Sequence, residues 1–271
     1  MPWLHFRVDG VMVSAYGFLT SQMQKEKAQS RGLADILEFD GPIMLDSGGF
    51  QHLKGKDISY NPKELVDFAK KSGADFLFAL DYPPRDYSDD FACLSRKNFK
   101  NYMVMASLTD VIPVVHAPPK LAAKEIKSLK PLHPSYVAVG GLVPSLRGWI
   151  KATLETIDLV HMELPESRVH LLGFGAPKIG SQYLRKAYSV DYCGWRTAAA
   201  TNYLLTPNGY RKIGTRNKRG HAARPNRAEH LLIHTTCRKL GINRRTLTKD
   251  FASRAIFNAY VATRIMKHRP L

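Results

Sequence analysis

Short apolar runs that end in polar residues or glycines recur along this chain. The most pronounced is Ile43-Met44-Leu45, which leads into Asp46-Ser47-Gly48-Gly49-Phe50-Gln51, and similar runs end at Asp81, His116, Gly141, Gly173 and Asp191. A short apolar run followed by a tight turn is typical of a buried strand. The ends lie 18 to 35 residues apart, close to the ~30 residues per unit of a barrel built from eight βα units.

The segments between these runs have the end signals and periodicity of helices. Asn61 and Pro62 suit the start of one helix, and Gly73 suits its end. Further helices are expected over 21–37, 86–108, 120–129, 153–162 and 181–187. Alternating strands and helices indicate a parallel sheet with helical cover. The predicted fold class is therefore α/β, a (β/α)8 TIM barrel in a single domain over 1–271.

The C-terminal part of the chain has a different character. From Pro207 onward it holds 16 Lys/Arg and only 2 Asp/Glu. Tyr210–Gly214 is expected to supply the eighth strand, and closing helices are expected across 227–267, as Arg227–Leu240 and Leu247–Lys267. The segment 209–227 is predicted to be a flexible basic loop, and its cations are Arg211, Lys212, Arg216, Lys218, Arg219, Arg224 and Arg227.

The charge of the whole chain points to a polyanionic partner. Its 271 residues include 40 Lys/Arg against 23 Asp/Glu, a formal net charge of +17. Such an excess favours nucleic acid, because each phosphate that is neutralised releases condensed counterions. The alternative is a basic surface that serves only solubility. We expect the seven cations of 209–227 to contact the phosphate backbone.

The cysteines and the apolar stretches exclude several classes of protein. Cys93, Cys193 and Cys237 are odd in number and far apart, which argues against a disulfide framework and against a structural zinc site. No apolar stretch approaches the ~20 residues that span a bilayer, and the first residues lack the pattern of a signal peptide. We therefore expect a cytoplasmic protein with no membrane association, no metal and no cofactor.

Several of these motifs together resemble the tRNA-guanine transglycosylase superfamily. They are Asp46-Ser47-Gly48-Gly49-Phe50-Gln51, the turns Gly140-Gly141-Leu142 and Leu172-Gly173-Phe174-Gly175, and the strand end at Asp191, and they occur in the family's order. The resemblance covers about Val11 to Asp191, and Phe251–Met266 also resembles the family's last barrel helix. It implies a TIM barrel that exchanges a guanine in nucleic acid for a 7-deazaguanine base.

The resemblance also implies roles for individual carboxylates. Asp191 matches the nucleophile that attacks C1′ of the sugar and forms a covalent glycosyl-enzyme intermediate, as retaining glycosidases do. Asp46 matches a second carboxylate that touches the base and handles protons. The alternatives are a helix cap for Asp191 and a capped strand-to-turn junction for Asp46.

The expected base pocket comprises further residues at the strand ends. Asp81 would accept hydrogen bonds from N1–H and the 2-amino group of guanine, although it could instead be a turn residue before Pro83-Pro84. Backbone N–H groups at Gly141 and Leu142 would meet the carbonyl oxygen or the 7-substituent. The remaining expected contacts are Phe50 and Leu172 on the two ring faces, with Ser47 and Gly173 beside them.

Two departures from the family pattern bear on the substrate. The family commonly has Gln at the position of His116, which either contacts the base through its ring donor or is a packed residue. The family's tRNA enzymes typically carry a zinc site that these cysteines do not match. The missing zinc spacing, the compact length and the strong charge favour DNA as the substrate. Exchange in tRNA is the alternative, and a nucleic-acid-binding protein without catalysis is the alternative from another class.

Overall fold

The computed structural model describes the chain except residue 87 and residues 142–148, 174–185, 214–224 and 267–271. Its contacts divide the chain into two compact units, and each is described by itself. The strand unit comprises Asp9–Gly173 and Lys186–Asp191. The hairpin unit contains Met1–Val8 and the described residues of 192–271. The single domain expected over 1–271 stays a prediction.

The strand unit contains seven strands that are all parallel. They pair in the orders β1-β2-β3 and β4-β5-β6-β7, and a parallel bridge between Phe78 and Ile112 joins the end of the first series to the start of the second. Strand order therefore follows the sequence order without exception. The strands are β1 Val11–Ser14, β2 Ile43–Asp46, β3 Phe76–Leu77, β4 Val114–His116, β5 Tyr136–Gly140, β6 Arg168–Leu171 and β7 Ser189–Val190.

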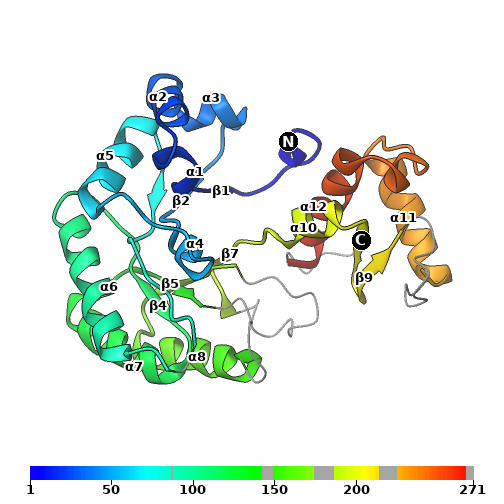
Figure 1. The fold of residues 1–271 in the computed structure, drawn as a ribbon. Helices are drawn as coiled ribbons and strands as arrows, with labels where there is room; N and C mark the ends of the chain where they lie inside the picture. Colours follow the sequence, from blue (N-terminus) through cyan, green and yellow to red (C-terminus); the bar gives the residue numbers. More distant parts are fainter. Residues whose placement is uncertain (87, 142–148, 174–185, 214–224, 267–271) are drawn as a thin grey trace. The chain divides into compact units, whose positions relative to one another are not determined.

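Helices follow the strands and form an outer layer of this unit (Figure 1). They are α1 Tyr16–Leu19, α2 Gln22–Arg31, α3 Leu33–Leu37, α4 Gly49–Leu53, α5 Pro62–Ser72, α6 Phe91–Ala106, α7 Pro119–Leu129, α8 Trp149–Glu163 and the 3-10 turn η2 Lys130–Leu132. Helix α5 shows why they form: Asn61 and Glu64 make a reciprocal capping box, and Gly73 closes the helix at φ 72°. Its apolar face, including Leu65 and Phe68, is buried.

Two expected helices have different bounds in the structure. The helix expected over 21–37 is broken into α2 and α3 at Gly32, whose φ of 79° ends the first segment. The helix expected from residue 86 begins later, at Phe91. The reason is Asp90, whose carboxylate accepts hydrogen bonds from the backbone N–H groups of Ala92 and Cys93 and so caps the first turn.

The hairpin unit differs from the prediction for the eighth strand and for the first four residues of the basic loop. Gly209–Lys212 forms β9, which pairs antiparallel with β8 through a two-residue turn at Pro207 and Asn208. So short a connection permits only antiparallel pairing, whereas a parallel barrel strand requires a crossover. The other elements of this unit are the 3-10 turns η1 Pro2–Leu4 and η3 Thr246–Thr248, α10 Gly194–Ala200, β8 Tyr203–Thr206, α11 Arg227–Lys239 and α12 Phe251–Met266.

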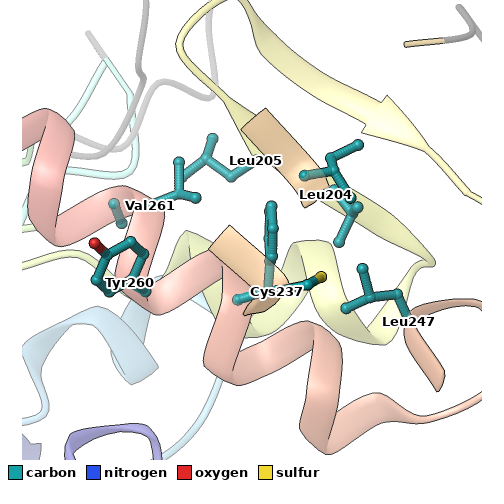
Figure 2. Packing of buried hydrophobic residues seen from close by; sticks show 9 residues of the cluster. Leu204, Leu205, Cys237, Leu247, Tyr260 and Val261 are labelled. Carbon is teal, nitrogen blue, oxygen red and sulfur yellow. The ribbon is translucent and has the colours of Figure 1, made fainter. Parts of the chain in front are cut away.

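An apolar cluster joins β8, α11 and α12 of the hairpin unit (Figure 2). Leu204 and Leu205 of β8 meet Cys237 of α11 and Val261 of α12, and all four are buried. Burial of such side chains stabilises a fold by roughly 1.5–3 kcal/mol each. None of the helices in the described part of the chain is long and apolar enough to cross a bilayer.

Candidate active site

Three carboxylates lie at the carboxyl ends of strands in the strand unit. Asp46 is the last residue of β2, Asp81 follows β3 and its bridge residue Phe78, and Asp191 comes directly after β7. Parallel strands that pair in sequence order bring their carboxyl ends to one edge of the sheet, where α/β proteins bind ligands. The three side chains expected to form a site therefore belong to one face of this unit.

The pKa of Asp46 shows that these carboxylates influence one another. Partial burial, then the negative charge of Asp81, then that of Asp191 raise the pKa of Asp46 to about 7. A hydrogen bond from the backbone N–H of Gly48 opposes the rise but does not cancel it. Asp46 therefore exchanges protons near neutral pH, as a general acid or base requires.

The two glycines after Asp46 are required by close packing. A Cβ at Gly49 would lie 2.6 Å from Asp81 Oδ1 and 2.5 Å from the Asp81 carbonyl oxygen. Gly48 has φ 88°, and a Cβ there would lie 2.5 Å from the Tyr60 hydroxyl. No other residue type fits at either position without displacing the carboxylate end of β3 or Tyr60. The Gly-Gly pair thus lets the β2 turn pass directly over Asp81.

Asp81 is held by one side-chain donor on each carboxylate oxygen. The Ser47 hydroxyl donates to Oδ1 at 2.5 Å, and His116 Nε2 lies 2.8 Å from Oδ2. Ser47 is fully buried, and its carbonyl oxygen accepts a hydrogen bond from Tyr60. The Asp81 side chain has 10% of its surface exposed to solvent. A carboxylate has about four lone-pair sites, so each oxygen keeps capacity for one more donor.

His116 occupies a buried position between two carboxylates. Its Nε2 faces Asp81, its Nδ1 lies 3.0 Å from Glu125 Oε1, and its backbone N–H donates to Glu125 Oε2 at 2.7 Å. Asn98 donates to Glu125 Oε1 at 2.9 Å. Both ring nitrogens are therefore engaged by protein groups. These contacts are those expected of the packed alternative, and the contact of His116 with the base stays a prediction.

Asp191 is oriented from β6. Its Oδ1 accepts a hydrogen bond from the backbone N–H of Gly173 at 2.6 Å and lies 3.4 Å from His170 Nε2. His170 is almost fully buried, and its Nδ1 lies 2.8 Å from the Ser189 hydroxyl. Both contacts fall on Oδ1, so Oδ2 is the oxygen that can approach another atom. Gly173 thus contacts the expected nucleophile, a role that the sequence did not indicate.

The remaining pocket residues lie near these strand ends. Phe50 is on α4 with 39% of its surface exposed, and Lys54 Nζ lies 4.7 Å from its ring centroid. Leu172 is half-buried directly after β6. Gly141 follows β5 with φ 68°. Leu142 lies outside the described residues.

The basic residues expected to bind phosphate have different environments. Arg211 is paired with the buried Glu229, at 2.9 Å from Nε and 2.7 Å from an outer nitrogen, so its charge is compensated within the hairpin unit. Its contact with phosphate stays a prediction. Lys212 is half-buried, and Arg227 is exposed at the start of α11. The other four cations, Arg216, Lys218, Arg219 and Arg224, lie outside the described residues.

Three polar residues of this network escaped the sequence analysis. His170 stands inside a buried strand, Glu125 is on the buried face of α7, and Asn98 is on the buried face of α6. For Glu125 and Asn98 the sequence does contain a signal, which is a charged or amide side chain on the apolar face of an amphipathic helix. Among the described residues, no group of His, Cys, Asp or Glu is arranged to hold a metal ion.

Comparisons with known proteins place this chain in a family. A family model described as queuine tRNA-ribosyltransferase matches residues 5–182. The tRNA-guanine(15) transglycosylase of Thermoplasma acidophilum is 28% identical over 221 residues, which are 76% of this chain and 34% of that protein. The protein of the same name from Picrophilus torridus is 30% identical over 220 residues, 77% and 34% of the two chains. That of Methanosarcina barkeri is 28% identical over 223 residues, 76% and 44%.

The chain belongs to the queuine tRNA-ribosyltransferase family. The predicted α/β class, of the (β/α)8 barrel type, is confirmed by this membership and by the parallel strands. The chain spans between a third and a half of the length of these relatives. Their names refer to tRNA, which supports the alternative nucleic acid and gives no support to DNA. Asp191 lies nine residues beyond the end of the family match.

Proposed function

We propose that this protein exchanges guanine in tRNA for another purine base of the 7-deazaguanine class. The observation that carries the proposal is the group of three carboxylates at the carboxyl ends of β2, β3 and β7, one of which has its pKa raised to about 7 by burial and by the other two. Pairs of titratable groups with separated pKa values are typical of acid–base catalysis. Membership of the family and the names of the relatives support the same reaction.

In the first half-reaction, Asp191 Oδ2 attacks C1′ of the nucleotide. The bond from C1′ to N9 of guanine breaks, a bond from C1′ to Asp191 forms, and the leaving guanine takes a proton at the base. Asp46, which is partly protonated near neutral pH, is the acid that supplies this proton. The Gly173 N–H and His170 hold Oδ1 of the nucleophile meanwhile.

The second half-reaction reverses these steps with the incoming base. The ionised Asp46 removes the proton from the ring nitrogen of that base, which attacks C1′ and displaces Asp191. Because the covalent intermediate keeps the polynucleotide attached to Asp191 between the two halves, the nucleic acid cannot dissociate before the incoming base attacks C1′. Asp81 distinguishes guanine and its 7-deaza analogues by accepting two hydrogen bonds from N1–H and the 2-amino group.

A radiolabelled guanine assay tests this proposal. Purified protein is incubated with labelled guanine and either unmodified tRNA or duplex DNA, and the label retained in polynucleotide is counted. Incorporation into tRNA, together with a denaturant-resistant adduct between protein and tRNA, supports the proposed function. Incorporation into DNA alone would move the substrate to the DNA branch. Binding of either nucleic acid without incorporation would favour a protein without catalysis.

A further inference from the structure

We propose that His116 is a positioning residue that carries a lasting positive charge and, held by Glu125, fixes Asp81 in the orientation that receives the base. This inference deepens the proposed function and rests on it. His116 does not touch the substrate, because it is fully buried. It acts through Asp81, the carboxylate that faces the purine in that proposal.

The geometry around His116 permits only one protonation state with all contacts favourable. Each ring nitrogen lies within hydrogen-bond distance of a carboxylate oxygen, Asp81 Oδ2 at 2.8 Å and Glu125 Oε1 at 3.0 Å. A neutral imidazole has one N–H, so its other nitrogen would direct a lone pair at a carboxylate. The imidazolium donates to both.

The charges near His116 come from two neighbouring elements. Asp81 faces it from the end of β3 and Glu125 from α7, while the neutral Asn98 of α6 lies 3.5 Å from Nδ1. Desolvation lowers the pKa of His116, but the charge of Glu125 and the hydrogen bonds of Asp81 and Glu125 outweigh it and raise the pKa to about 10.

Packing on the far side of the ring keeps His116 in this position. A Cβ at Gly140 would lie 3.1 Å from Cδ2 of His116, tighter than ordinary contact. The glycine that ends β5 thus leaves room for the Cδ2–Nε2 edge of the imidazole. Tight packing at this edge and carboxylates at both nitrogens leave the ring a single orientation.

The consequence is a carboxylate whose open lone pairs have fixed directions. Ser47 occupies one site on Asp81 Oδ1 and His116 occupies one site on Oδ2. The remaining sites lie one on each oxygen, the arrangement that two adjacent donors of guanine require. A purine with a 6-amino group and no N1–H, such as adenine, meets acceptor against acceptor there. His116 and Glu125 therefore contribute to specificity without contacting the base.

Nuclear magnetic resonance of histidine-labelled protein tests the charge directly. The nitrogen signals of His116, assigned by their loss in His116→Gln, are expected to stay in the imidazolium range from pH about 6.5 to about 8.5, where an ordinary histidine loses its proton. A neutral His116 at pH 7.5 would overturn the inference. This measurement requires no substrate, so its outcome is independent of the proposed function.

Glu125→Gln tests the positioning role. The new amide can donate to Nδ1, which stabilises the neutral ring with its proton on Nε2, so the pKa of His116 falls. We expect the ratio of wild-type to variant guanine affinity to grow roughly three- to tenfold between pH about 6.5 and pH about 8.5, since the hydrogen bond to Asp81 loses its charge in the variant alone. Glu155→Gln on α8, an exposed glutamate, is the matched control and should keep the pH profile of the wild type.

A merely structural role predicts a different result. In that case Glu125→Gln lowers thermal stability but leaves guanine affinity and its pH profile unchanged, and this outcome would overturn the inference. The double variant His116→Gln/Glu125→Gln removes both buried charges and guards against misfolding of either single variant. It should bind guanine more weakly than the wild type at every pH. If the wild type binds no guanine at all, the proposed function itself fails, while the resonance experiment still reports the charge.

Discussion

The two units of this protein use buried polar groups in opposite ways. In the hairpin unit, Asn258 accepts a hydrogen bond from the Leu205 N–H and donates to the Tyr203 carbonyl. Arg254 donates to the carbonyl oxygens of Ala199 and Leu247. These two buried side chains satisfy backbone atoms, which stabilises the connections between α12, α10 and β8.

In the strand unit the three carboxylates at the strand ends are like-charged. When they are ionised, the carboxylates of Asp46, Asp81 and Asp191 repel one another, as the raised pKa of Asp46 shows. An arrangement that costs free energy in the folded state is characteristic of a reactive site. The difference separates polar residues that hold the fold from polar residues that carry chemistry.

The largest effect is expected for Asp191→Asn. The amide keeps the shape of the side chain and can still accept a hydrogen bond from Gly173, but it is a poor nucleophile toward C1′. We expect base exchange to fall roughly 10⁴-fold or more, with thermal stability and tRNA binding nearly unchanged. Denaturant-resistant adducts seen on gels with the wild type should disappear.

Asp158→Asn is the matched control for this experiment. Asp158 is an exposed aspartate of α8 paired with Lys186 at 2.7 Å, so its loss should leave exchange intact. Substantial exchange by Asp191→Asn would show that the nucleophile is another residue and that the like-charged group has a different purpose.

Asn258→Ala probes the opposite side of the comparison. The substitution leaves the buried Leu205 N–H and the Tyr203 carbonyl without their partner, which should destabilise the protein by about 2–4 kcal/mol. Urea unfolding followed by circular dichroism measures the loss. The exposed Thr235→Ala on α11 should change stability by less than about 0.5 kcal/mol. If Asn258→Ala folds as stably as the wild type but loses guanine affinity, the hairpin unit has a functional polar residue and the distinction is wrong.

These two classes of residue were not equally accessible from the sequence. The carboxylates of the strand unit were predicted, because each follows an apolar run and precedes a turn, a purely local signal. The ends of β2, β4, β5 and β7 fall within two residues of the expected positions. The contact between His116 and Glu125 was not predicted, because Glu125 lies on the following helix and comes close to His116 only in the folded protein.

The hairpin unit was predicted less well for a related reason. The cations of 209–227 suggested an open basic loop, and β8 was missed altogether. A turn at Pro207 and Asn208 makes the β8–β9 hairpin. Arg211 of this hairpin pairs with Glu229, which lies eighteen residues further along the chain. The composition gives the number of charged residues but does not show which of them pair with an opposite charge.

The pH dependence of the first half-reaction tests the proton role of Asp46. Its carboxyl is protonated below its pKa of about 7 and ionised above it. Adduct formation with release of guanine needs the acid form, so its single-turnover rate should fall about tenfold for each pH unit above about 7.5. Asp46→Asn should remove this dependence along with most of the rate. A rate that stays constant up to pH about 9 would assign the proton to a different group.

The smallest effect is expected for Glu229→Gln in the hairpin unit. The hydrogen bond from Arg211, then those from Asn226 and Asn208, hold the pKa of Glu229 at about 2, below its ordinary value of 4.5. A lowered pKa means that the stabilisation is complete above pH 4.5 and is lost as pH falls toward 2. We expect Glu229→Gln to lower the free energy of unfolding by about 1–2 kcal/mol at pH 7, and the difference from the wild type to shrink as pH falls from about 4.5.

Urea unfolding of the wild type and of Glu229→Gln at pH 7 and at pH 3, with Glu155→Gln as the exposed control, measures this loss of stability and its pH dependence. Unchanged guanine affinity in the same variant would keep Glu229 among the residues that hold the fold, whereas a loss of affinity without a loss of stability would move it to the other class.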